Sequence, residues 1–153
     1  LVQVAGRAGR GDKPGQMWLQ THQPEHPLLA TLLTQGYIAA ARTLLNERQL
    51  LGLPPTGHLA LIRAEATRPD LPLHFLQQAA VEIVQSQSGV QAWGPVPAPM
   101  ARKAGFSRVH LLLKSDERKT LHALLATLVP WLDALPNARQ VRWSIDVDPQ
   151  ELQ

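Results

Sequence analysis

The sequence predicts an α/β chain in which residues 53–153 form an α+β domain of the ferredoxin-like order βαββαβ. Three observations support this fold class. Apolar residues switch between alternating and helical spacing in the order strand, helix, strand, strand, helix, strand. The two βαβ halves are each about fifty residues long. A cluster of glycine and proline at residues 52–57 separates this domain from residues 1–52.

The first part of the chain is predicted to hold a short strand and two helices. Residues 16–21 alternate between apolar and polar side chains, as a strand does. Leucine and isoleucine recur at helical spacing over residues 25–51, and Gly36 is expected to divide this stretch into two helices.

Each element of the second part has its own local signal. The predicted elements are a strand over 58–66, a helix over 72–86 with Leu73, Leu76, Ala80 and Ile83 on its apolar face, a strand over 90–96, a strand over 106–114, a helix that Ser115 caps and Pro130 kinks or ends, and a strand over 141–147. Glycine and proline near residue 96 indicate an edge strand, followed by a proline-rich loop that carries Arg102 and Lys103.

The last predicted strand shows how the sheet is oriented. Trp143 and Ile145 fall on one side of it, while Arg142, Ser144 and Asp146 fall on the other. Two helices packed on one face leave the opposite face solvated, or covered by a partner or by the remainder of a longer protein.

The composition excludes several classes of site. The chain has 153 residues, a net charge of +3 and 44% hydrophobic residues, enough for a packed core. It has no cysteine, which excludes disulfides, thiolate metal sites and cysteine nucleophiles from this piece. We find no apolar run of membrane-spanning length and no signal peptide, and therefore expect a soluble cytoplasmic protein that does not bind membranes.

The segment QVAGRAGR at residues 3–10 carries the most specific motif. Gln3, Gly6, Arg7, Gly9 and Arg10 match the pattern QxxGRxGR. Arginines three apart on a helical turn reach one anion together, and their planar donors suit a γ-phosphate. The pattern resembles motif VI of superfamily 2 helicases, although a basic, glycine-rich surface loop is the alternative.

This resemblance implies roles for the same residues. Arg7 and Arg10 would be arginine fingers, Gln3 would orient the attacking water or touch the terminal phosphate, and all five residues would bind nucleotide. ATP and Mg²⁺ would be bound mainly by a preceding region. The chain is therefore expected to begin inside the motif and to be the C-terminal piece of a longer protein.

Five blocks in order extend the resemblance over the whole chain: QVAGRAGR, LQTHQPEHPLL, ERQLLGLPP, GPVPAP and WSIDVDP. They resemble the C-terminal third of the PriA (primosomal protein N′) family of replication restart helicases. The resemblance implies that residues 1–52 end a RecA-like helicase lobe and that residues 53–153 form a DNA-binding domain. It also implies an ATP-dependent 3′ to 5′ DNA helicase, monomeric and associated with the bacterial nucleoid, with zinc bound only by cysteines upstream of this piece.

The family binds branched and single-stranded DNA, single-stranded DNA-binding protein and other primosome proteins. Candidate DNA contacts here are Arg102, Lys103, Phe106 and Arg108, with ordinary solvated charges as the alternative. Basic and aromatic residues are usual over residues 105–110 in the family, and only Phe106 and Arg108 keep that character, which argues against strong base stacking by this strand.

Arg118 and His122, one helical turn apart, match positions near the family's pocket for the acidic tail of single-stranded DNA-binding protein. A plain helix surface is the alternative for this pair.

No metal site is predicted in the chain. His22 and His26 are four apart, but Pro24 and Pro27 prevent a regular helix there. Asp146 and Asp148 form a DxD pattern that is better explained as the end of a strand.

Two interpretations compete with a helicase piece. The chain is a non-catalytic nucleic-acid-binding module if the longer protein lacks a phosphate-binding loop. It is a protein-docking platform if the open sheet face packs on another protein, and steep salt dependence would distinguish DNA binding from apolar docking.

Overall fold

The computed structural model describes residues 18–150 of the chain. The chain divides into two units, Leu1–Glu47 and Arg48–Gln153. The motif VI residues Gln3, Gly6, Arg7, Gly9 and Arg10 lie outside the described residues.

In the first unit, described residues 18–26 form no helix or strand, and a helix begins at Pro27. Helix α2 (Pro27–Leu50) is interrupted at Gly36, whose φ of 83° and ψ of 179° are not helical, so the predicted division into two helices is confirmed. The Nδ1 atom of His26 accepts a hydrogen bond from the Leu28 amide at 3.2 Å, which satisfies one free donor at the start of the helix. The predicted strand is wrong over residues 18–21, because a strand needs a paired neighbour and none of the described residues pairs with this segment.

Helix α2 is long and apolar enough by composition to cross a membrane, which was not predicted from the sequence. The break at Gly36 leaves nine residues before it and fourteen after it. At 1.5 Å per residue these pieces are about 14 and 21 Å long, and a bilayer core is about 30 Å thick. Neither piece alone is long enough to span a membrane.

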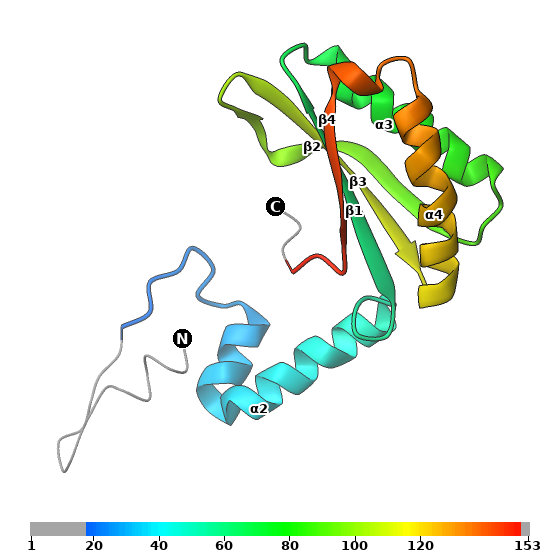
Figure 1. Ribbon diagram of the computed structural model, residues 1–153. Helices are drawn as coiled ribbons and strands as arrows, with labels where there is room; N and C mark the ends of the chain where they lie inside the picture. The colour runs from blue at the N-terminus through cyan, green and yellow to red at the C-terminus, as the bar shows by residue number, and fades with distance from the viewer. Residues whose placement is uncertain (1–17, 151–153) are drawn as a thin grey trace, which may run out of the picture. The chain divides into compact units, whose positions relative to one another are not determined.

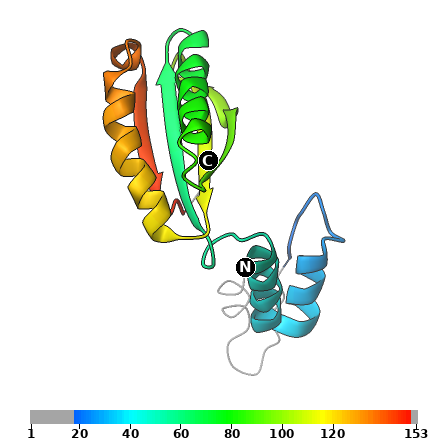
Figure 2. The same cartoon turned by 90° about the vertical axis from the view of Figure 1, so that its right-hand side faces the viewer.

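The second unit contains a four-stranded antiparallel sheet with two helices on one face (Figures 1 and 2). Its elements are β1 (His58–Ala66), α3 (Asp70–Gln85), β2 (Gln91–Lys103), β3 (Phe106–Ser115), α4 (Arg118–Ala134), a short 3-10 turn (Ala138–Gln140) and β4 (Arg142–Val147). The strand order β2-β3-β1-β4 and the βαββαβ succession are compatible with a small ferredoxin-like domain. The described residues do not form a RecA-like lobe.

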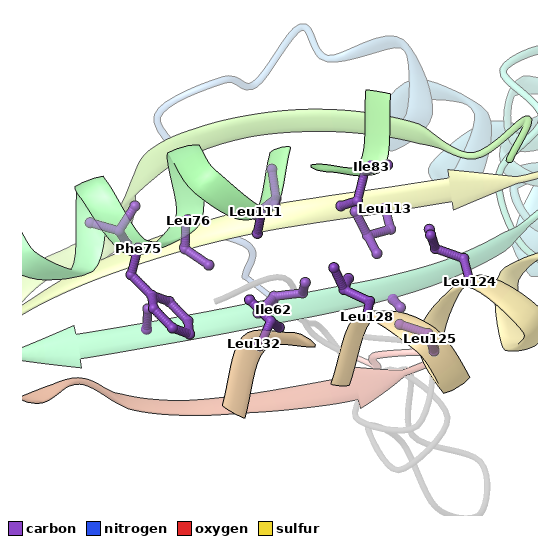
Figure 3. Close-up of a cluster of buried hydrophobic side chains, with 14 of the residues drawn as sticks. Ile62, Phe75, Leu76, Ile83, Leu111, Leu113, Leu124, Leu125, Leu128 and Leu132 are labelled. Carbon is purple, nitrogen blue, oxygen red and sulfur yellow. The ribbon is translucent and has the colours of Figure 1, made fainter. Parts of the chain in front are cut away.

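The core lies between the sheet and the two helices (Figure 3). Alternate residues of β1 and β3 point into it, and α3 and α4 supply the other layer. The side chains labelled in Figure 3 are Ile62, Phe75, Leu76, Ile83, Leu111, Leu113, Leu124, Leu125, Leu128 and Leu132. Trp143 packs against this cluster with its ring centroid 6.0 Å from that of Phe75, which confirms the predicted inward side of β4.

Strand β2 is longer than predicted. It continues through the proline-rich segment to Lys103, so Arg102 and Lys103 lie in a strand and not in the predicted loop. Proline is tolerated because β2 is at the edge of the sheet, and the pairing with β3 shifts register twice along this stretch. The predicted edge position is confirmed.

Three predictions about the helices are wrong at least in part. Leu76 and Ile83 are buried as predicted, but Leu73 is 38% exposed, and α3 also buries Pro72, Phe75 and Ala79. Ser115 ends β3 and does not cap α4, although its Oγ accepts a hydrogen bond from the Glu117 amide at 3.3 Å. Helix α4 does not end at Pro130, one of the two predicted outcomes, but continues to Ala134, because burial of Leu132 in the core favours another turn of helix.

Candidate nucleic-acid interface

A tight hairpin between β2 and β3 brings together the predicted DNA contacts. Arg102 pairs with Ser107 and Lys103 pairs with Phe106 across the two strands. Ala104 and Gly105 form the turn, and both have positive φ, 49° and 83°, as a two-residue hairpin of type I′ requires. Arg102 and Lys103 are exposed at the end of the sheet.

Phe106 and Arg108 continue from this hairpin onto the open face of the sheet. The guanidinium carbon of Arg142, on β4, lies 4.8 Å from the centre of the Phe106 ring. One face of the Phe106 ring is therefore covered by a cation, which restricts the ring's access to a base.

The open face carries a polar hollow of about 290 Å³ between β1, β3 and β4. Strand pairing explains its composition, because residues opposite each other on neighbouring strands share a face. Glu65 lies between Arg108 and Arg142 in one row, and Arg63 lies between His110 and Ser144 in the next. We call this hollow the arginine hollow; its polar lining is Arg63, Glu65, Arg108, His110, Arg142 and Ser144.

Two carboxylates hold the guanidinium groups of this hollow. Arg63 donates to Asp146 Oδ2 at 3.0 Å. Glu65 is shared, with 3.8 Å from its Oε2 to Arg108 Nε and 3.9 Å from its Oε1 to Arg142 Nη1. Three arginines against two carboxylates leave one net positive charge (3 − 2 = +1) on this part of the face.

His110 is the most enclosed polar side chain of the open face. The residue is only 5% exposed, and its Nε2 has no hydrogen-bond partner among the described residues. Burial lowers the pKa of His110 below its ordinary value of 6.5, and the positive charges of Arg63 and Arg108 lower it further. His110 is therefore harder to protonate than an exposed histidine.

A second hollow of about 210 Å³ lies on the other side of His110 and is mainly apolar. We call it the tryptophan hollow; its lining includes Leu61, Trp93, Val96, Pro97, His110 and Leu112. Trp93 is 43% exposed, and Lys114 Nζ lies 5.5 Å from its ring centre. Lys114 also donates to the Leu51 carbonyl at 2.9 Å, which holds this cation over one face of the indole.

Arg118 and His122 lie together on the exposed surface of α4. The Nε atom of Arg118 donates to His122 Nε2 at 3.5 Å, the upper limit for a hydrogen bond. The structure places the pair one turn apart, as expected from its spacing, and away from the open sheet face.

Among the described residues, no three histidines or acidic side chains gather as metal ligands do. Asp146 is occupied by Arg63, and Asp148 follows the end of β4 with a φ of 53°. The DxD pattern is therefore the end of a strand, as predicted.

Arg63, Glu65 and His110 were not predicted from the sequence as parts of a site. The sequence does contain a signal for Arg63 and Glu65. Charged residues two positions apart in an otherwise apolar strand indicate the solvated face of that strand. The partnership of Glu65 with Arg108 and Arg142 depends on strand order, which no local pattern reveals.

Comparison with known proteins decides the family. The family model described as "Primosomal protein N C-terminal domain" matches residues 49–150. The chain belongs to this family. This confirms the PriA-type resemblance predicted from the five sequence blocks.

Curated relatives of this PriA-type chain are named "Replication restart protein PriA". The protein of Haemophilus influenzae is 48% identical over 99% of this chain and 20% of its own length. The protein of Synechocystis sp. is 38% identical over 74% of this chain and 14% of its own. The protein of Bacillus subtilis is 28% identical over 97% of this chain and 19% of its own length. The chain thus spans about a fifth or less of these relatives.

Among solved structures, the de novo designed protein Foldit4 gives a TM-score of 0.47 at 12% identity, covering 62% of this chain and 99% of its own. Nothing further follows from a likeness of that size.

Proposed function

We propose that this chain is the C-terminal part of an ATP-dependent 3′ to 5′ DNA helicase that acts in replication restart in the bacterial cytoplasm, at the nucleoid. Its second unit contacts branched and single-stranded DNA. The family match and the names of the curated relatives support a role in replication restart. The DNA contact is supported by the surface described above.

The main support for the DNA contact is the arrangement of positively charged side chains. Arg102 and Lys103 lie exposed at the β2–β3 hairpin, and Arg108 follows on β3. Arg63 and Arg142 place two more guanidiniums beside Arg108 on the open sheet face. Guanidinium groups donate in a planar fork that fits phosphate oxygens, so this surface suits a nucleic-acid backbone.

ATP hydrolysis belongs to the longer protein. Gln3, Gly6, Arg7, Gly9 and Arg10 would contact the nucleotide across a cleft, with ATP and Mg²⁺ held mainly by a region that this chain lacks. Zinc would be bound by an upstream region, since this chain has no cysteine. In the longer protein, Arg10→Ala should abolish DNA-stimulated ATP hydrolysis and spare nucleotide binding.

The chain also has a candidate protein-docking point. Arg118 and His122 form an exposed polar pair that can donate to the acidic tail of single-stranded DNA-binding protein. In this function the second unit links the helicase to DNA and to its primosome partners.

The test of the DNA contact is a charge reversal at the hairpin in the longer protein. Arg102→Glu with Lys103→Glu should weaken binding to a forked DNA and reduce the slope of log K against log salt by about 2, one unit for each phosphate that is no longer neutralised. The matched control is Lys119→Glu with Arg139→Glu, which reverses two exposed charges on α4 and the following turn. Equal weakening in both double variants would contradict the assignment, because the effect would then be one of net charge alone.

A further inference from the structure

Two hollows of different chemistry meet at His110 on the open sheet face. The arginine hollow and the tryptophan hollow have this one lining residue in common. The histidine is almost fully buried, and its Nε2 is a polar atom without a partner among residues 18–150. Buried polar atoms are normally hydrogen-bonded, so an unpaired one between two hollows indicates a ligand position.

The spacing of the hollows is set by the strands. Arg108, His110 and Leu112 are successive residues on the open face of β3, each about 6.8 Å from the next along the strand. Arg108 lines the first hollow and Leu112 lines the second. The two hollows share His110, so a ligand that fills both has a charged end on the Arg108 side of this histidine and an apolar end on the Leu112 side.

Each hollow fits one part of a nucleotide. The first presents the guanidiniums of Arg63, Arg108 and Arg142, a donor set suited to a phosphate. The second presents the half-exposed indole of Trp93 beside apolar side chains, and indole is a platform on which any base stacks. His110 lies between them with an unpaired nitrogen for a polar atom of the sugar or base, among the residues that the structure describes.

We propose that the open sheet face binds one nucleotide of a single DNA strand, with its phosphate in the arginine hollow and its base against Trp93. The proposal deepens the proposed function and rests on it. It assigns base stacking to Trp93 on β2, which is 43% exposed, and not to Phe106 on β3, which is less exposed. Each of the two rings has a cation over one face, Lys114 for Trp93 and Arg142 for Phe106, so a base would stack on the other face of the indole.

A protein segment is the competing occupant of this face. An acidic peptide would pair with the arginines, but it would leave the indole without a specific partner. The combination of a phosphate-type donor set with an aromatic platform favours a nucleotide. If a nucleotide is the occupant, binding should therefore depend on whether the strand carries bases.

The experiment uses the longer protein without ATP and two single-stranded oligonucleotides of equal length, one all-thymidine and one with abasic sites in place of the bases. Trp93→Leu should weaken binding of the thymidine strand by about five- to a hundredfold. It should leave binding of the abasic strand unaffected, because that strand has no base to stack on the indole. Trp93→Phe keeps an aromatic ring and should retain most of the affinity.

The phosphate end is tested by the salt dependence of binding. Arg142→Gln should reduce the slope of log K against log salt by about 0.7 for a single strand. Trp93→Leu should leave this slope unchanged. Arg139→Gln is the matched control, since it removes an exposed arginine outside the sheet.

A second measurement needs no variant. A strand carrying 5-iodouracil should crosslink on irradiation to the peptide that contains Trp93, as mass spectrometry of the digest would show. Equal effects of Trp93→Leu on both strands, or crosslinks elsewhere only, would overturn the proposal. If Arg102→Glu with Lys103→Glu weakens DNA binding while Trp93→Leu does not, the nucleotide site is refuted and the proposed DNA contact stands. If neither change has an effect, the nucleotide site and the DNA contact are both refuted.

Discussion

Glu65 gives the sharpest prediction, because removing it should improve DNA binding. Its carboxylate lies 3.8 Å from Arg108 and 3.9 Å from Arg142, so it competes with any phosphate for the same two guanidiniums. Glu65→Gln keeps the size of the side chain and removes the charge. We expect tighter binding of single-stranded DNA by the longer protein.

The magnitude follows from Coulomb's law. A phosphate on the far side of these guanidiniums would lie about 7 Å from the Glu65 carboxylate, where two unit charges repel by about 0.6 kcal/mol in water and about 2.4 kcal/mol at an effective dielectric constant of 20. The Glu65 side chain is 35% exposed, which favours the lower figure. Affinity should therefore rise by about three- to tenfold at low salt.

The assay is fluorescence anisotropy of a labelled oligonucleotide over a range of salt concentrations. Glu82→Gln on α3 makes the same change of charge on the helical side of the sheet and serves as the control. In the double variant Glu65→Gln with Arg142→Gln, most of the increase in affinity should disappear. Unchanged or weaker binding in Glu65→Gln would refute the reasoning, since the carboxylate would then act only by holding the arginines in place.

Three further predictions concern the stability of the 153-residue chain in urea unfolding. Phe75→Ala should cost about 3 to 5 kcal/mol because Phe75 is fully buried against Trp143, whereas Val84→Ala, at a residue 71% exposed, should cost less than about 0.5 kcal/mol. Because the pKa of His110 is lowered by folding, the unfolded chain binds more protons than the folded chain below pH 6.5. The free energy of unfolding should therefore fall with decreasing pH, by at most about 1.4 kcal/mol per pH unit, until the folded pKa is reached. His110→Gln should remove this component, and identical pH profiles of stability for the two proteins would contradict the prediction. Gly105→Ala should cost about 1 to 2 kcal/mol through its positive φ alone, because no described atom would crowd the added Cβ, and a neutral effect would show that the turn rearranges.

Much of the second unit is predictable because its signals are local. The alternation in β1, β3 and β4 and the helical spacing of α3 and α4 follow from which side chains must reach one core. The predicted β2 is too short because proline ordinarily ends a strand. Its extension to Lys103 depends on pairing with β3, which the hairpin turn determines and the β2 sequence itself does not.

The site is predictable only in part for a related reason. Arg102, Lys103, Phe106 and Arg108 are neighbours in sequence, and the hairpin keeps them together. The hollows combine residues from strands far apart along the chain, such as Arg63 with Arg142 and Trp93 with Leu61. Their proximity follows from the strand order, which places β1 between β3 and β4, and from the register shifts of β2 against β3.

The two carboxylates of the open face have opposite effects on the proposed DNA contact. Asp146 and Glu65 fix the directions of three guanidiniums, so less side-chain entropy is lost when a phosphate binds. The same carboxylates reduce the net charge of the hollow to +1, which weakens the attraction for DNA. For the proposed DNA contact, the ordered donors would give a defined binding geometry, while the low net charge would keep dissociation fast.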